Sequence, residues 1–151
     1  MRFNTQKNTA CMSRNSGFTL TELMVTVAIV AVLSMVAYPS FMDSVRKSKR
    51  TDAQTALTRA SSNLERFFAT NGRYTTDATQ LGLKIEDGAA YTDNGHYTVA
   101  VTAGTTGIGS SYVVTATAKA GDMQADDEGC TVLAVDSFGR RTPDPTASRC
   151  W

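Results

Sequence analysis

Hydrophobic residues are concentrated in one long run near the start of the chain. Residues 23–38 read LMVTVAIVAVLSMVAY and contain no charged residue, no glycine and no proline. Extended back to Phe18, the run takes in a single charged residue, Glu22. At about 1.5 Å per residue, a helix over 18–38 is roughly 30 Å long, the thickness of a bilayer's hydrocarbon core. The pattern predicts one transmembrane helix over 18–38.

A helical pattern continues beyond Pro39, but it becomes amphipathic. Apolar residues recur at spacings of three and four, at Ala53, Leu57, Ala60, Leu64 and Phe67, which is one face of a helix. Asn71-Gly72 then supplies a C-terminal stop. We therefore expect 39–71 to form the amphipathic half of one long helix. Because proline lacks an N–H and clashes with the preceding turn, Pro39 is expected to kink or locally unwind it.

The rest of the chain predicts a small head. Residues 72–95 lack clear periodicity and are expected to form a loop with a helical turn near 78–83. Segments rich in β-branched residues then predict strands over 96–102, 112–118 and 130–136. Short links favour antiparallel neighbours. The predicted fold class is α+β, with a long N-terminal helix packing through Leu57, Leu64 and Phe67 on a small antiparallel sheet.

Charge is unevenly distributed. The formal net charge is +1, so the chain has no global basic field for nucleic acid. Residues 1–17 hold Arg2, Lys7 and Arg14 and no acid, and a basic segment before an apolar run is a targeting pattern. A conventional secretory signal is an alternative, although Ala37-Tyr38-Pro39 makes a poor cleavage site. Basic residues at 46–50 also follow the run, so the positive-inside rule alone leaves orientation open.

Catalytic signatures are missing from the sequence. It has one histidine and contains neither an H-E-x-x-H nor a G-x-S-x-G pattern. We expect a protein that is not an enzyme and that holds no cofactor and no metal.

Residues 16–22, SGFTLTE, resemble the type IV prepilin signature: a basic leader ending in glycine, then phenylalanine, then a glutamate and an unbroken apolar helix. Many pilins also carry a proline at the position of Pro39. The resemblance implies the type IV pilin fold. It also implies that prepilin peptidase cleaves between Gly17 and Phe18, removing 1–17 as a leader, and methylates the Phe18 amine. Translation from Met12 would give a shorter leader.

The resemblance also assigns a role to Glu22. In the family, this glutamate is thought to neutralise the N-terminal amine of a neighbouring subunit during assembly. A carboxylate near the centre of an apolar helix costs about 2.5–3.5 kcal/mol, which favours a partner over the alternative that Glu22 snorkels to the membrane surface. The implied location is the bacterial inner membrane, single pass with the head in the periplasm. The assembly platform would then move the chain into a surface pilus with other pilin subunits.

Cysteines suggest a C-terminal loop. Of three cysteines, Cys11 lies in the leader, which leaves Cys130 and Cys150. An even count in an oxidising compartment indicates a disulfide, and the position resembles the disulfide-bounded loop of pilins. The pattern GCTVL…GRR…CW resembles PilE-type minor pilins in particular. We expect a minor pilin acting in pilus assembly, and thereby in twitching motility, adhesion or DNA uptake.

Two further functions remain open. Arg140, Arg141 and Arg149 lie near Trp151 in the sequence, and a basic, aromatic patch is typical of DNA contact. This favours a DNA-binding minor pilin for natural transformation. The acidic run of Asp122, Asp126, Asp127 and Glu128 can instead pair with those arginines, or bind calcium as in some type II secretion pseudopilins. A pseudopilin is the second alternative, and a membrane-tethered enzyme or ligand-binding module is more distant.

The basic residues that follow the apolar run allow a similar choice. Arg46, Lys47, Lys49 and Arg50 lie just outside it and can contact phospholipid headgroups or DNA. A solvated helix face, or ion pairs between subunits, is the interpretation we favour.

Overall fold

A computed structural model describes residues 17–151, so most of the expected leader, including Cys11 and Met12, lies outside the described residues. The chain divides at Pro39 into two units, the second being Ser40–Trp151. One helix, α1 (Leu20–Asn71), contributes to both units and is helical through Pro39. The local unwinding expected there is not observed.

The N-terminal unit consists of the start of α1. Thr19 caps the helix, because its hydroxyl accepts a hydrogen bond from the Glu22 backbone N–H at 3.2 Å. Every large apolar side chain from Leu20 to Tyr38 is more than half exposed, the least exposed being Ile29 at 54%. By length and composition this helix can cross a membrane. An isolated apolar helix of this kind needs a covering partner, either lipid or protein.

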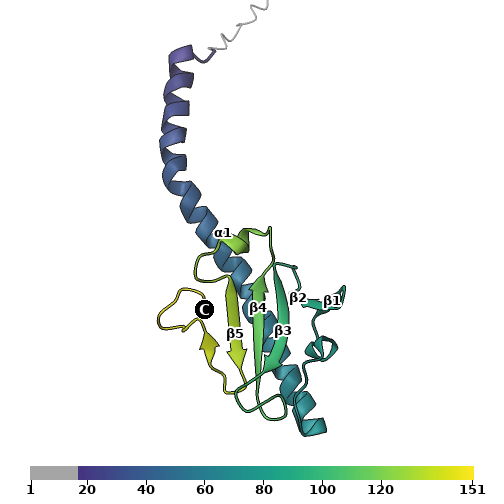
Figure 1. Ribbon diagram of the computed structural model, residues 1–151. Helices are drawn as coiled ribbons and strands as arrows, with labels where there is room; N and C mark the ends of the chain where they lie inside the picture. The colour runs from purple at the N-terminus through teal and green to yellow at the C-terminus, as the bar shows by residue number, and fades with distance from the viewer. Residues whose placement is uncertain (1–16) are drawn as a thin grey trace, which may run out of the picture. The chain divides into compact units, whose positions relative to one another are not determined.

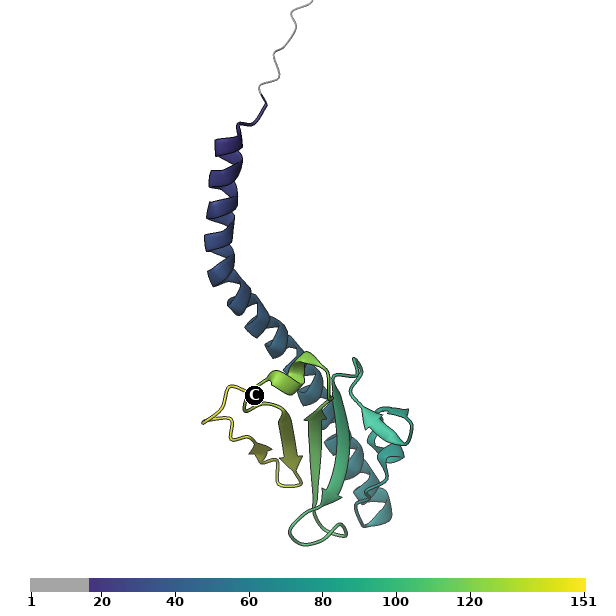
Figure 2. The same cartoon turned by 45° about the horizontal axis from the view of Figure 1, so that its top comes forward.

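The second unit contains a sheet of six strands in sequential order, all antiparallel. The strands are β1 (Lys84–Glu86), β2 (Ala89–Tyr91), β3 (Tyr97–Ala103), β4 (Tyr112–Ala118), β5 (Val132–Asp136) and β6 (Arg141–Thr142). Two short 3₁₀ helices, η1 (Ala78–Leu81) and η2 (Met123–Asp126), lie in its connections. Figure 2 shows η2 and the β3–β4 loop at opposite ends of the sheet.

Three strands were not predicted. β1 and β2 lie in the stretch expected to be a loop, and β6 lies in the C-terminal loop. All three are two or three residues long, and β1 and β6 are exposed along their whole length, so neither produces the alternation that identifies a half-buried strand.

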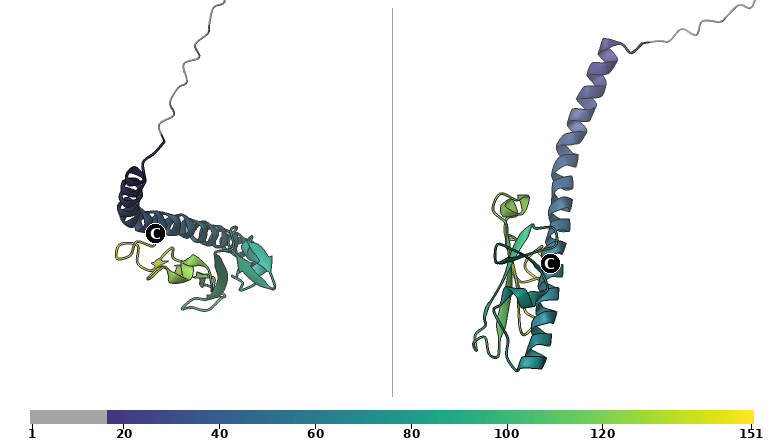
Figure 3. Two further views of the ribbon diagram at one scale, coloured as in Figure 1. Left: turned by 90° about the horizontal axis from the view of Figure 1, so that it is seen from above. Right: turned by 90° about the vertical axis from the view of Figure 1, so that its right-hand side faces the viewer.

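The core lies between one face of the sheet and the second half of α1, which form two layers (Figure 3). Ala53, Leu57, Ala60 and Leu64 are buried on the helix, at the predicted three- and four-residue spacings. Buried residues on β3 and β4 alternate with more exposed ones, as a half-buried sheet requires. Phe67 was predicted to complete the core, which is wrong: it is outside the buried cluster, and Leu81 and Tyr74 belong to it instead.

Leu81 reaches the core because the chain turns sharply after η1. Gly82 follows in the left-handed region at φ 65°, where side chains other than glycine are strained. Asn63 on α1 donates a hydrogen bond to the Leu81 carbonyl at 2.8 Å, and a Cβ on Gly82 would collide with this Asn63 amide. The glycine therefore allows η1 to pack closely on the helix.

Candidate assembly and binding surfaces

The expected processing site precedes the start of α1. Gly17 and Phe18 are both non-helical and exposed, and the Phe18 side chain is 82% exposed. Thr19 is the N-cap and Glu22 the third helical residue, the S/T-x-x-E spacing of a capping box. The position places the Glu22 carboxylate where the helix dipole favours negative charge. The capping pattern was visible in the sequence but was not used there.

The loop before β5 is tied to α1 by ion pairs. Arg50 donates from Nε and Nη2 to the two carboxylate oxygens of Asp127, each at 2.6 Å. Both side chains are largely buried, with 12% and 5% exposed. Lys49 bonds Asp122 at 3.0 Å, and His96 Nδ1 lies 2.9 Å from the other Asp122 oxygen. Thus two of the four basic residues after the apolar run stabilise the head of their own chain.

These pairs correct two interpretations drawn from the sequence. The acidic run does not pair with Arg140, Arg141 or Arg149 in the chain, since Asp122 and Asp127 bond the helix instead. The favoured interpretation of the basic run as solvated, or as paired between subunits, is likewise wrong for Lys49 and Arg50. Sequence reasoning missed these contacts because the partners are 73 and 77 residues apart.

Two side chains near this loop have shifted pKa values. Burial opposes the ionisation of Asp122, but bonds from His96, the Gln124 backbone N–H and Lys49 outweigh it and hold the pKa of Asp122 well below its usual value. Burial raises the pKa of Tyr97, whose hydroxyl accepts a 2.6 Å bond from the Gln124 side chain. The hydrogen bonds that hold the loop therefore involve an ionised Asp122 carboxylate and a neutral Tyr97 hydroxyl.

The predicted disulfide is confirmed. Cys130 and Cys150 are bonded with a Cα–Cα distance of 5.4 Å, and α1 holds the end of this loop. Gln54 donates to the Cys150 carbonyl at 2.9 Å, and Arg50 donates from Nη1 to the Arg149 carbonyl at 2.8 Å. The C-terminal segment is thus fixed to the helix at consecutive residues.

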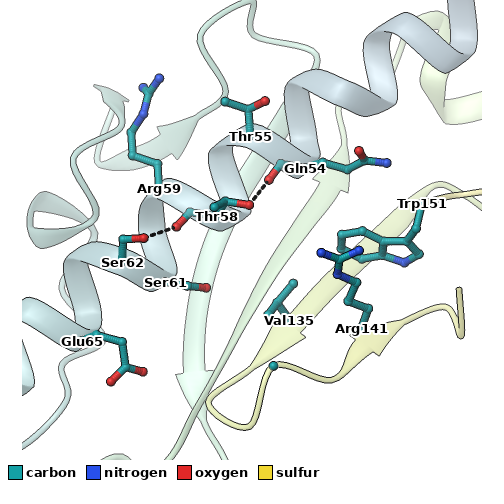
Figure 4. Close-up of a pocket in the computed structure, with 11 residues that line it drawn as sticks. Gln54, Thr55, Thr58, Arg59, Ser61, Ser62, Glu65, Val135, Arg141 and Trp151 are labelled. Carbon is teal, nitrogen blue, oxygen red and sulfur yellow. Dashed lines mark hydrogen bonds between the residues drawn. The ribbon is translucent and has the colours of Figure 1, made fainter.

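A groove of about 720 Å³ runs between α1 and the C-terminal segment. Figure 4 shows its helix wall, where Thr55, Thr58 and Ser62 present hydroxyls, and the opposite wall of Arg141, Val135 and Trp151. The three hydroxyls donate to backbone carbonyls four residues earlier, at 2.8–2.9 Å. The helix wall therefore offers few free donors.

Glu65 closes one end of the groove. Its carboxylate accepts hydrogen bonds from the hydroxyls of Tyr74 and Tyr112, each at 3.0 Å. Burial is the main cause that raises the pKa of Tyr112 to about 12, and the neighbouring Glu65 adds to it. Tyr112 thus stays neutral at physiological pH and joins the sheet to the helix.

The arginines proposed for DNA contact differ in their partners. Arg140 Nε bonds Asp136 at 2.6 Å, and the Arg140 guanidinium lies 5.2 Å from the Phe138 ring centroid. Arg141 lies 5.1 Å above the Trp151 ring and has no carboxylate partner within residues 17–151. The structure thus leaves the charge of Arg141 more available than that of Arg140. In the described part of the chain, no group of three or more His, Cys, Asp or Glu residues is placed to hold a metal ion.

Comparisons with known proteins agree with this architecture. Residues 39–134 match the family described as "Type IV minor pilin ComP, DNA uptake sequence receptor", and residues 12–38 match the prokaryotic N-terminal methylation motif. The chain belongs to the type IV pilin family, within the group defined by the ComP minor pilins. The family resemblance predicted from the sequence is therefore confirmed, and with it an α+β pilin fold.

The chain is also similar to individual proteins of known type. The chain is 32% identical over 125 residues to the type IV major pilin protein PilA of Myxococcus xanthus, covering 83% of this chain and 51% of PilA. It is 32% identical over 73 residues to the type II secretion system core protein G of Dickeya chrysanthemi, covering 48% of each chain. The matched regions span about half the length of these relatives. A solved type IV pilin from Shewanella oneidensis aligns with a TM-score of 0.45 and 23% identity, covering 70% of this chain and 97% of that one.

Proposed function

We propose that this chain is a minor pilin, a structural subunit of the type IV pilus that acts in pilus assembly. Twitching motility, adhesion or DNA uptake would depend on it through the pilus. The observation that supports this most is the exposure of the apolar half of α1, which carries one charged residue, Glu22, and is followed by a compact head. Lipid covers the apolar side chains of such a helix first, and the helices of neighbouring subunits cover them after assembly.

The maturation steps are part of this proposal. Prepilin peptidase cuts between Gly17 and Phe18, and the new amine of Phe18 is methylated. The chain is held in the bacterial inner membrane by a single pass, with its head in the periplasm, until the assembly platform moves it into the filament. There the Glu22 carboxylate of one subunit neutralises the Phe18 amine of another, and Pro39 kinks the helix.

Processing and assembly can be tested separately. The mature protein should begin at Phe18 and carry one added methyl group by N-terminal sequencing and intact-mass measurement. Glu22→Ala should be processed normally yet be absent from sheared surface pili, because the amine of a neighbour would then lose its counter-ion. Glu86→Ala, on the exposed strand β1, is the matched control and should enter pili. A different mature terminus would end the proposal, and normal incorporation of Glu22→Ala would end the role of Glu22.

A second candidate function is DNA capture for natural transformation. It is favoured by the matched family, whose description names a DNA uptake sequence receptor. It is also favoured by the exposed Arg141 beside Trp151, and by the exposed Arg149 two residues before Trp151 in the sequence. Gel shifts of the full chain across salt concentrations test it. Arg141→Ala and Arg149→Ala should weaken binding and each lower the salt slope by about one, whereas Lys84→Ala should not. Binding equal to that of a charge-matched protein would exclude DNA capture.

Deletion of the gene distinguishes the candidate functions. Loss of surface pili supports a role in assembly, and normal pili with failed transformation support DNA capture. Retained pili with failed release of secreted proteins would support a pseudopilin, the function suggested by the similarity to core protein G.

A further inference from the structure

Both bridged cysteines are also tied to α1 by hydrogen bonds that do not pass through the disulfide. On one side, Arg50 bonds the Asp127 carboxylate, and the Asp127 carbonyl accepts a hydrogen bond from the Cys130 backbone N–H at 2.9 Å. On the other side, Gln54 donates to the carbonyl of Cys150 itself at 2.9 Å. The same helix therefore holds both cysteines.

Arg50 takes part in both of these connections. Its third nitrogen, Nη1, donates to the carbonyl of Arg149, the residue before Cys150, at 2.8 Å. The guanidinium is planar and its donors have a fixed geometry, so one side chain holds the two ends of the bridged segment in a defined arrangement. Arg50 and both cysteines are largely buried, which strengthens these hydrogen bonds relative to exposed ones.

The segment between the cysteines has little freedom in the folded chain. Strand β5 begins two residues after Cys130 and pairs with β6 through Ala134 and Val135. Only residues 143–148 lie between β6 and the first carbonyl held by α1. A short connection between two fixed points allows far fewer conformations than the same residues in an unfolded chain. The fold therefore keeps the two sulfur atoms close even when no covalent bond joins them.

We propose that Arg50 and Gln54 are positioning residues for disulfide formation. They hold Cys150 beside Cys130 in the reduced chain, so that the bond closes within a head that has already folded. One cysteine thiolate attacks a small disulfide oxidant such as oxidised glutathione, which forms a mixed disulfide and releases one glutathione thiolate. The second cysteine thiolate then attacks the protein sulfur of the mixed disulfide and releases the second glutathione. The two cysteines are oxidised, the oxidant is reduced, and the two cysteine protons pass to the released thiolates.

Trp151 reports on the position of the segment, since it is the only tryptophan in the chain. Its fluorescence is compared with and without dithiothreitol, in the full chain in detergent and with the fold monitored by circular dichroism. In the wild type, reduction should leave the emission maximum unchanged, because the bonds to α1 remain. In Arg50→Lys, which keeps the charge but loses the fork, reduction should shift the emission to longer wavelength. The oxidised variant should resemble the wild type, because the disulfide still holds the segment.

Equilibrium with glutathione measures the same effect on the cysteines. The fraction of chains with the Cys130–Cys150 bond is determined by alkylation and peptide mapping, which distinguish it from products of Cys11. Gln54→Met removes one hydrogen bond and little volume, and it should lower the equilibrium constant for the bond roughly tenfold in the folded chain. In concentrated urea, where the helix contacts are absent, Gln54→Met and the wild type should agree. A change in thiol chemistry unrelated to positioning would persist in urea.

Exposed residues of the same types provide matched controls. Arg66→Lys on α1 and Gln80→Met on η1 should behave as the wild type in both assays. A shift of the wild-type emission on reduction would overturn the proposal, and so would unshifted emission in reduced Arg50→Lys. An equilibrium constant in folded Gln54→Met equal to that of the wild type would also overturn it. If Arg50→Lys does not fold, Gln54→Met decides in both assays, and neither assay depends on entry into pili.

Discussion

Arg50 and Asp127, 77 residues apart in sequence, form a two-pronged ion pair in which both hydrogen bonds measure 2.6 Å. The pair joins the second half of α1 to the loop before β5, and the remaining Arg50 nitrogen, Nη1, holds the Arg149 carbonyl. One helix side chain therefore fixes both ends of the disulfide-bounded segment. Such a forked arginine–carboxylate geometry is specific, and lysine cannot reproduce it.

Removing one partner of this pair should destabilise the head strongly. Asp127→Asn leaves the largely buried Arg50 guanidinium uncompensated, and breaking a buried pair in this way costs about 3 kcal/mol or more. Urea unfolding of the full chain in detergent, followed by circular dichroism, measures the loss. The adjacent Asp126→Asn, at an exposed position, should stay within about 0.5 kcal/mol of the wild type. Equal effects of the two variants would mean that the pair contributes little.

The helix–sheet interface should be equally sensitive to lost volume. Leu57 is completely buried between α1 and the sheet, and replacing such a leucine by alanine removes contacts and leaves a cavity, at a cost of about 2–5 kcal/mol. Leu57→Ala should therefore lower the free energy of unfolding in the same assay. Thr55→Ala, two residues earlier and exposed, should change it little. A change below 1 kcal/mol for Leu57→Ala would contradict the packing described here.

The disulfide should stabilise the head mainly by restricting the unfolded chain. Cys130 and Cys150 are 20 residues apart, and the chain-entropy estimate for such a loop is about 3 kcal/mol. The double variant Cys130→Ser/Cys150→Ser should lose about this much stability. Addition of reductant should destabilise the wild type to the level of the double variant and leave the variant itself unaffected. A variant as stable as the wild type would show that the helix contacts alone hold the C-terminal segment.

Sequence patterns predicted the elements whose side chains have a regular environment. The strand expected over 112–118 coincides with β4, and the helix ends at Asn71 as the following glycine indicated. The apolar spacings located four of the five predicted helix core residues, and only Phe67 was wrong. There the periodicity continues, but Phe68 stacks on Tyr74 at 4.5 Å, and Leu81 from η1 fills the core.

The contacts that organise the candidate surfaces were much harder to predict. Lys49 and Arg50 read as one basic run with Arg46 and Lys47, and nothing local in the sequence distinguishes the two that pair within the chain. The groove beside Trp151 likewise depends on how the C-terminal segment crosses the helix, which is set by hydrogen bonds to Gln54 and Arg50. Long-range electrostatic partners are determined by the fold, so they become visible only once it is known.

Acid should weaken the head through Asp122. The pKa of Asp122 is held below its usual value of about 4, because bonds from His96, the Gln124 backbone and Lys49 outweigh the effect of burial. A carboxylate with a depressed folded-state pKa contributes stability above its unfolded-state pKa, and this contribution is lost as the pH falls towards the folded-state value. The free energy of unfolding should therefore decline as the pH drops below about 4. In Asp122→Asn this decline should be shallower and the stability at pH 7 lower, whereas Asp126→Asn should follow the wild-type curve. Parallel acid limbs for Asp122→Asn and wild type, measured by urea unfolding at each pH, would assign the acid sensitivity to other carboxylates, such as Asp136, whose pKa is also lowered.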